Sequence, residues 1–170
     1  MTPEQPDISV IIVSWNVRDL LRQCLRSLAA GRGGLDVEVI VVDGASADGS
    51  AAMVSSDFPW VTLIACDENV GFPRGNNIGM ARANGRYLLL LNPDTEVQAG
   101  AVDRLLAFSR AHPRAGITGG RTVFPDGSLN IASCWMRMTP WSAFCMATGL
   151  TTAFRGNALF NPEGMGSWAR

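Results

Sequence analysis

A short polar turn directly after a run of leucines is the first place where this sequence could do chemistry. Tyr87 and four leucines at positions 88–91 are followed by Asn92, Pro93 and Asp94. The apolar run predicts a strand buried on both faces, as in the middle of a parallel sheet. Pro93 would end the strand and leave Asp94 just past its carboxyl end, where α/β sheets bind ligands. A carboxylate there can hold a divalent cation, although an Asn-Pro-Asp turn in which Asp94 bonds its own backbone gives the same pattern.

Polar groups also follow three earlier apolar runs, which we predict to be strands over residues 8–13, 37–42 and 61–65. Trp15 and Asn16 come after the first, Asp43 after the second, and residues 67–69 after the third. The carboxyl ends of parallel strands meet at one sheet edge. An aromatic ring for a base, carboxylates for base or ribose, and a carboxylate for a metal would together form a nucleoside-diphosphate site. Each also has a structural explanation: Trp15 could cap the core, and Asp43 could cap a turn.

Helical patterns alternate with these strands. Apolar residues recur at helical spacing from Val17 to Leu28, with Asn16 as a candidate N-cap. Further helices are predicted over residues 50–56, over 74–84 with Gly85 as the stop, and over 101–112, where His112 would cap the end before Pro113. A strand over 117–124 and a return over 129–133 would form a hairpin. The alternation predicts an α/β fold, a Rossmann-like, mainly parallel sheet flanked by helices.

Composition excludes several classes of protein. The 170 residues suit one domain, and 47% of them are hydrophobic, enough for a sizeable core. A formal net charge of −1 gives no electrostatic case for nucleic-acid binding. All 14 basic residues are arginine, which excludes a Schiff-base or phosphate-loop lysine. The four cysteines form no C-x-x-C pair, the polar N-terminus is unlike a signal peptide, and no stretch is long enough to span a membrane. These features favour a reducing, cytoplasmic setting.

Two familiar nucleotide-binding folds do not fit the first turn. Residues 14–19, after the first predicted strand, contain no glycine, so the backbone cannot wrap a pyrophosphate as dinucleotide-binding enzymes do. A sugar-nucleotide pyrophosphorylase would need a glycine-rich loop with arginine and lysine at the same place. Both classes are therefore disfavoured.

The last part of the chain has a different character. From Cys134 onward aromatic and methionine residues follow no long period, and no charge occurs between Arg137 and Arg155. Thr139 and Pro140 could open a helix to about residue 148. We therefore expect a domain over residues 1–133 and an aromatic-rich tail over 134–170. Its apolar residues indicate a surface that something else covers. This could be an acceptor region, a partner protein, a second copy of the chain, or a membrane surface.

Four stretches in order resemble the family 2 glycosyltransferases of the GT-A fold, nearest their rhamnosyltransferase-like branch. These stretches are residues 9–16 (SVIIVSWN), 41–50 (VVDGASADGS), 69–79 (NVGFPRGNNIG) and 91–95 (LNPDT). The resemblance covers residues 8–137. It implies a metal-dependent inverting transferase in cell wall or polysaccharide synthesis. Such an enzyme would move a sugar from a nucleoside-diphosphate sugar, UDP- or dTDP-linked first of all, to a glycan or lipid-linked saccharide, at the inner face of the membrane.

The resemblance also implies roles for single residues. Trp15 would stack near the nucleobase, with Asn16 beside it, and Asp43 would hydrogen-bond the base. Asp94 would bind Mg²⁺ or Mn²⁺ and bridge to the diphosphate, with Asn92 at the first position of an Asp-x-Asp-like motif. The floor under the nucleotide and diphosphate would be formed by Asn69, Arg74 and Asn77.

The sequence departs from the family pattern at two places. Gly44 stands where relatives commonly have asparagine. The Glu-Asp motif that usually supplies the general base has no convincing copy, because Glu163 is the only acidic residue after Asp126. The catalytic base is therefore unassigned. The alternative is a non-catalytic nucleotide-sugar-binding module, or a half-site that acts with a partner.

Overall fold

The structure is a computed structural model that describes residues 5–31, 33–128, 130, 139–154, 156–157 and 159–161. It divides into two compact units, residues 1–116 and 117–170, which are treated separately below. The domain boundary expected between residues 133 and 134 lies outside the described residues.

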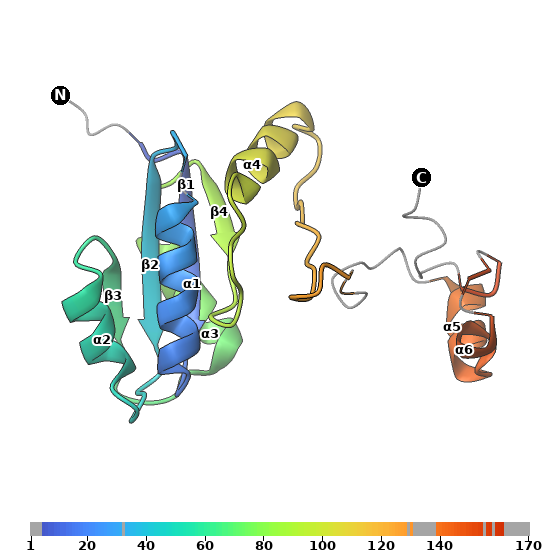
Figure 1. The fold of residues 1–170 in the computed structure, drawn as a ribbon, viewed down its shortest axis with the longest axis horizontal. Helices are drawn as coiled ribbons and strands as arrows, with labels where there is room; N and C mark the ends of the chain where they lie inside the picture. The colour runs from blue at the N-terminus through green and yellow to red at the C-terminus, as the bar shows by residue number, and fades with distance from the viewer. Residues whose placement is uncertain are drawn as a thin grey trace. The chain divides into compact units, whose positions relative to one another are not determined.

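The first unit is built on a four-stranded sheet in the order β3-β2-β1-β4 (Figure 1). The strands are β1 (Ile8–Ser14), β2 (Val37–Asp43), β3 (Thr62–Ala65) and β4 (Tyr87–Leu90). All three pairings are parallel, which confirms the predicted sheet type and places the four carboxyl ends at one edge. The strands lie within about one residue of their predicted limits.

Helices cover both faces of this sheet (Figure 1). The helices of the first unit are α1 (Arg18–Ala30), α2 (Ser50–Asp57), α3 (Gly71–Arg82) and α4 (Ala101–Ala111). The apolar face of α1 packs on the core-facing residues of β1 and β2 together with α2. On the opposite face, α3 lies so close to β1 that a Cβ on Gly79 would be 2.5 Å from the Ile11 side chain. This close packing fixes the loops that precede and follow α3.

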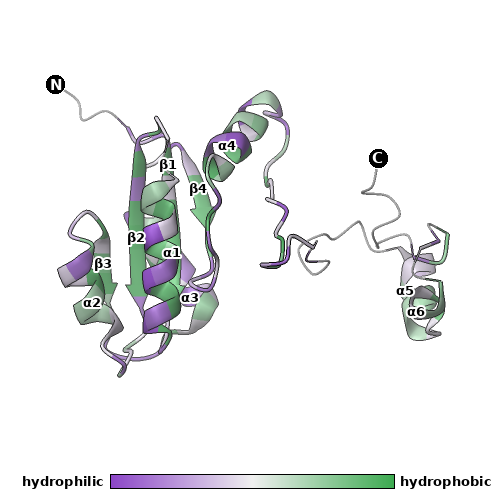
Figure 2. Ribbon diagram, in the orientation of Figure 1, coloured by the Kyte–Doolittle hydropathy of each residue, from purple (hydrophilic) through white to green (hydrophobic). Residues whose placement is uncertain are grey.

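The burial predicted for the leucine strand is wrong. Leu88 and Leu90 are 49% and 48% exposed, because β4 is the edge strand of the sheet and pairs only with β1 among the described residues. Leu88 and Leu90 lie opposite Ser9 and Ile11 of β1, on the face of the sheet that α3 packs against. Because α3 contacts mainly β1 and β2, it leaves these two leucines of β4 uncovered. Most of the strand is coloured as hydrophobic in Figure 2, although one of its faces is open.

Helix ends follow the prediction in part. Asn16 is not the N-cap of α1: Val17 occupies that position, and Asp48 from the next loop accepts the N–H of Arg18 at 2.8 Å. Gly85 does not end α3, which ends at Arg82. Gly85 instead lies close to β1, because a Cβ added to Gly85 would be 2.4 Å from the backbone nitrogen of Ser9. His112 caps the end of α4 as predicted.

The second unit contains a turn and two short helices. A turn at residues 125–128 is closed by backbone hydrogen bonds from the Phe124 N–H to the Ser128 carbonyl at 2.8 Å and from the Asn130 N–H to the Thr122 carbonyl at 3.0 Å. Of the return predicted over residues 129–133, all but residue 130 lies outside the described residues. Residues 117–122 do not form the predicted strand. The helix predicted from Pro140 is confirmed as α5 (Pro140–Ala147) and is followed by α6 (Leu150–Ala153).

Candidate functional site

The carboxyl ends of the strands bring the predicted polar groups to one edge. Ser14 pairs with Asp43, and Asp43 pairs with Ala65, at the ends of β1, β2 and β3. On the other side of β1, the N–H of Leu91 extends the β4 ladder by donating to the Ile11 carbonyl at 2.9 Å. The residues that follow each strand therefore leave the sheet from the same edge, as the sequence predicts.

Asp43 is the buried carboxylate of this edge, with only 2% of its surface exposed. Its Oδ2 accepts the N–H of Ser46 at 2.9 Å. Its Oδ1 is buried and has no hydrogen-bond partner among the described residues. A buried carboxylate oxygen without a donor is costly, so this atom is suited to receive an N–H from a bound molecule.

The loop that carries Trp15 is fastened to the loop that follows β2. Asn16 adopts a left-handed backbone conformation with φ of 54°. Its N–H donates to the Ser46 hydroxyl at 2.9 Å, and its side-chain oxygen accepts the N–H of Ala47 at 2.8 Å. Trp15 itself is exposed. Two hydrogen bonds therefore join the loop that carries the exposed Trp15 to the loop that follows the buried Asp43.

Asp48 adds a further link between these two loops, and the sequence did not indicate a role for it. It accepts the Arg18 N–H through one oxygen, and both the N–H and the hydroxyl of Ser50 through the other, at 3.0 and 2.6 Å. Desolvation alone would raise the pKa of Asp48, but these bonds outweigh it and the pKa is lowered. The polar run before α2 was the available signal, since such residues often bond backbone groups at a helix start.

The loop between β3 and α3 supplies Asn69 next to Gly44. The Asn69 side-chain oxygen accepts the N–H of Gly71 at 2.9 Å and lies 3.4 Å from the place where a Cβ on Gly44 would be. A Cβ at position 44 would therefore be in ordinary van der Waals contact with the Asn69 side chain. On α3, Arg74 pairs with Glu68 at 3.1 Å, and both side chains are exposed; Asn77 is exposed one turn further along.

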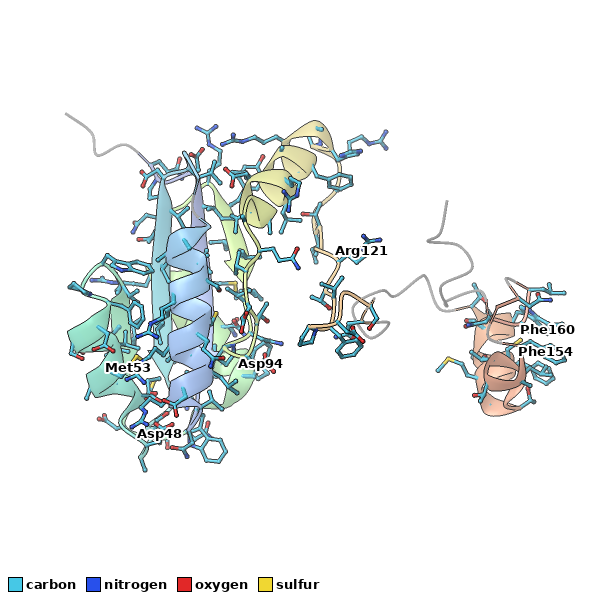
Figure 3. All side chains as sticks on the ribbon, in the orientation of Figure 1. Asp48, Met53, Asp94, Arg121, Phe154 and Phe160 are labelled. Atoms are coloured by element: carbon cyan, nitrogen blue, oxygen red, sulfur yellow. The ribbon has the colours of Figure 1, made fainter. Side chains whose placement is uncertain are left out.

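Asn92 and Asp94 lie in the irregular segment that follows β4, and both are exposed. Asp94 is labelled on this segment in Figure 3. The Thr95 N–H donates to the Asn92 carbonyl at 3.2 Å. The buried Cys24 of α1 lies beneath this turn, with its sulfur 3.7 Å from the same carbonyl oxygen. Burial raises the pKa of the Cys24 thiol to about 12, and the negative charge of Asp94 adds to that rise.

The donor groups at this edge suit one kind of metal site. Among the described residues, no three His, Cys, Asp or Glu side chains are grouped as a protein-only cation cage would need. Mg²⁺ and similar hard cations are instead commonly held by one or two carboxylates together with the phosphates of a substrate. The exposed carboxylate of Asp94 and the amide of Asn92 fit that arrangement.

Comparison with known proteins identifies the family. The sequence model of glycosyl transferase family 2 matches residues 9–165. The chain belongs to this family. The succinoglycan biosynthesis protein ExoO of Rhizobium meliloti is 34% identical over 102 residues, which cover 59% of this chain and 29% of ExoO. An N-acetylglucosaminyl-diphospho-decaprenol L-rhamnosyltransferase of Mycobacterium tuberculosis is 26% identical over 133 residues, which cover 72% and 43% of the two chains.

Solved structures of the same family fold confirm the GT-A architecture. TarS 1-349 of S. aureus in complex with UDP-GlcNAc is 25% identical with a TM-score of 0.55, over 63% of this chain and 32% of TarS. The mannosyltransferase PcManGT of Pyrobaculum calidifontis, in complex with GDP-Man and Mn²⁺, is 21% identical with a TM-score of 0.56, over 69% and 35% of the two chains.

This chain spans less than half the length of each of these four proteins. Within the described part of the chain, no helix has the length and apolar character needed to cross a membrane.

Proposed function

We propose that this chain binds the nucleotide of a nucleoside-diphosphate sugar at the shared carboxyl edge of its strands, as the donor site of a metal-dependent inverting glycosyltransferase. The observation that carries the proposal is Asp43, a buried carboxylate whose Oδ1 has no hydrogen-bond partner among the described residues. Asp43 pairs in the sheet with Ser14, the residue before the exposed Trp15. In this proposal Asp43 reads the base, Trp15 stacks on it, and Asn16 keeps the two loops together.

The chemistry of the unpaired oxygen favours a base with an imide N–H. Uracil and thymine present an N3–H donor between two carbonyl oxygens, and a carboxylate accepts only. The Ser46 N–H already satisfies Oδ2 and holds the carboxylate in one orientation. A UDP- or dTDP-sugar is therefore the proposed donor. The structural similarity to TarS, which was solved in complex with UDP-GlcNAc, supports UDP as the first nucleotide to test.

The diphosphate would lie between α3 and the turn after β4. Arg74 would exchange its exposed pairing with Glu68 for a phosphate, and Asn69 and Asn77 would line the floor. Asp94, with Asn92 next to it, would hold Mg²⁺ or Mn²⁺ against the diphosphate oxygens. When bound, the cation would neutralise negative charge on the leaving nucleoside diphosphate.

The proposed acceptor is a saccharide or lipid-linked saccharide, in cell wall or polysaccharide synthesis. Inversion would need a base that removes the acceptor hydroxyl proton as the donor bond breaks. No residue of this chain is assigned to that role. The relatives named for succinoglycan and for decaprenol-linked rhamnosyl transfer support this class of acceptor. Free thiols at Cys24, Cys66 and Cys145 suit a reaction in the reducing cytoplasm, at the inner face of the membrane.

The alternative is a nucleotide-sugar-binding module that supplies half a site. It is favoured by one feature of the sequence: Glu163 is the only carboxylate side chain after Asp126 that could act as a base. Binding of the donor does not separate the two functions, but release of free nucleoside diphosphate in the presence of an acceptor does.

Calorimetric titration of UDP, dTDP, GDP and ADP, each with and without Mn²⁺, tests the proposal. We expect one uracil or thymine nucleotide to bind, and to bind more tightly with Mn²⁺. Binding of none of the four nucleotides would refute the site. Equal affinity with and without Mn²⁺ would refute its metal dependence.

A further inference from the structure

The segment that carries Asp94 has little regular structure of its own. Residues 91–100 belong to neither a helix nor a strand. Within the described residues, its one internal backbone hydrogen bond runs from the Thr95 N–H to the Asn92 carbonyl, and the N–H of Ala101, at the start of α4, donates to the Gln98 carbonyl. Something outside the segment must therefore set the position of the exposed carboxylate at residue 94.

One face of α1 makes these contacts. Cys24 donates its S–H to the Asn92 carbonyl oxygen at 3.7 Å. One turn later, the hydroxyl of Ser27 accepts the Val97 N–H at 2.9 Å and donates to the Cys24 carbonyl at 2.8 Å. The two contacts hold the segment at residues 92 and 97, on either side of Asp94.

Side-chain packing supports the same two points. Leu91 and Val97 both pack against the hydrophobic core, which includes the buried residues of α1. Cys24 is 1% exposed, so its S–H has no competing water. The Ser27 hydroxyl uses both its donor and its acceptor role, so it is fixed in one rotamer. The segment is therefore fastened to a rigid helix, while Asp94 between the two points remains open to solvent.

We infer that Cys24 and Ser27 are positioning residues for the metal-binding turn. They hold residues 92–97 so that the Asp94 carboxylate stands in place before the cation and the diphosphate arrive. The inference rests on the proposed function for the identity of the bound group, but the fastening itself can be measured without nucleotide.

Holding the segment in place should strengthen cation binding because it lowers the entropy cost of ordering the segment. A carboxylate on a loose segment must lose backbone freedom when it binds a cation, and each ordered residue weakens binding. Loss of the Ser27 acceptor leaves the Val97 N–H without its partner at a partly buried position. An effect of the size of one hydrogen bond corresponds to about fivefold in affinity.

The test uses Ser27→Ala in the full chain, with Ser56→Ala as the matched control. The Ser56 hydroxyl lies 3.3 Å from the carbonyl oxygen three residues back in its helix, Met53 on α2, and 2.7 Å from the Asp57 carboxylate. Its hydrogen bonds among the described residues do not include the turn. We expect Ser27→Ala to weaken UDP binding in Mn²⁺ about fivefold and to leave metal-free UDP binding unchanged. Ser56→Ala should leave both affinities unchanged. Equal losses with and without Mn²⁺ would contradict a positioning role.

Amide hydrogen exchange gives a second readout that needs no ligand. The Val97 amide should exchange faster in Ser27→Ala than in the parent chain, and at the parent rate in Ser56→Ala. An unchanged Val97 rate overturns the inference, whatever the nucleotide data show. Absence of Mn²⁺-dependent UDP binding in the parent chain overturns the proposed function instead.

Variants of Cys24 keep the inference testable if Ser27→Ala fails to fold. Cys24→Ser retains a donor of similar size toward the Asn92 carbonyl, and Cys24→Ala removes it. We expect Cys24→Ser to retain the Mn²⁺ dependence of the parent and Cys24→Ala to lose part of it. Identical Mn²⁺ dependence in the two variants would overturn the role of Cys24.

Discussion

Ser14 and Asp43 lie directly opposite each other in the parallel ladder of β1 and β2, and each has a buried side-chain oxygen with no hydrogen-bond partner among the described residues. Two such atoms at adjacent positions are unusual, because buried polar groups are nearly always paired. Both are at the strand ends from which Trp15 and Gly44 follow. Both oxygens therefore lie at the edge of the sheet where we propose that the nucleotide binds.

Replacing Asp43 with asparagine tests this point. The amide keeps the shape of the side chain but removes the charge, so a base N–H loses a charge-assisted bond. We expect UDP affinity to fall roughly ten- to a hundredfold, as for hydrogen bonds to charged groups, and base preference to broaden. Titration of the four diphosphates measures both effects. Asp36→Asn, an exposed aspartate before β2, is the control; an unchanged base profile in Asp43→Asn would mean that the base is read elsewhere.

Removing the carboxylate of Asp94 should abolish the metal dependence of nucleotide binding without changing the stability of the fold. Because the side chain is exposed, Asp94→Ala should change the free energy of unfolding by less than about 0.5 kcal/mol. The Mn²⁺-dependent part of nucleotide binding should disappear. Glu96→Ala removes an exposed acidic side chain two residues later and should behave as the parent. If Asp94→Ala still bound nucleotide more tightly in Mn²⁺, the metal role of this residue would be wrong.

The sequence predicted the strands and the shared edge at their carboxyl ends because both depend on local patterns. Apolar runs ended by polar residues are strong signals, and parallel strands necessarily share an edge. The burial of Leu88 and Leu90 could not be read in the same way, since a run of leucines is the same at the centre and at the border of a sheet. The residue that caps the start of α1 could not be predicted from neighbouring residues either, because Asp48 is 30 residues away from Arg18 in the sequence.

Glu38, at the opposite end of the sheet, predicts how stability depends on pH. Burial by itself would raise the pKa of Glu38, but hydrogen bonds from the Asn84 backbone, from Ser9, from the Asn84 side chain and from the Gly85 backbone outweigh it, and the pKa is lowered from its ordinary 4.5. A lowered carboxyl pKa stabilises the fold fully above the unfolded value, and this contribution is lost as pH falls through the folded value.

Urea unfolding at neutral pH and below the ordinary pKa of Glu38 measures this contribution. The parent chain should lose more stability on acidification than Glu38→Gln, which keeps an acceptor for Ser9 and Asn84 but cannot titrate. Equal losses in the two proteins would assign the acid sensitivity to other carboxylates. Asp36→Gln, an exposed acidic residue nearby, is a control that should follow the parent.

The aromatic residues of the second unit predict association with a membrane surface or with a second copy of the chain. Trp141 stacks on Phe144 with ring centroids 5.6 Å apart, and Phe154 contacts Phe160 at 5.0 Å. Phe144 is nevertheless 51% exposed on α5, in a stretch without charges from residue 139 to 154. Exposed aromatic groups of this kind favour an interface over water.

Sedimentation and liposome flotation test this surface. We expect the parent chain to associate with itself or with vesicles, and Phe144→Ser to weaken that association severalfold, because part of the exposed apolar area is removed. Phe72→Ser is the matched control, since Phe72 is 52% exposed but lies on α3 in the first unit. A parent chain that sediments as a single monomer and does not float with vesicles would refute both forms of association. Equal effects of the two variants would show that the surface is not confined to α5 and α6.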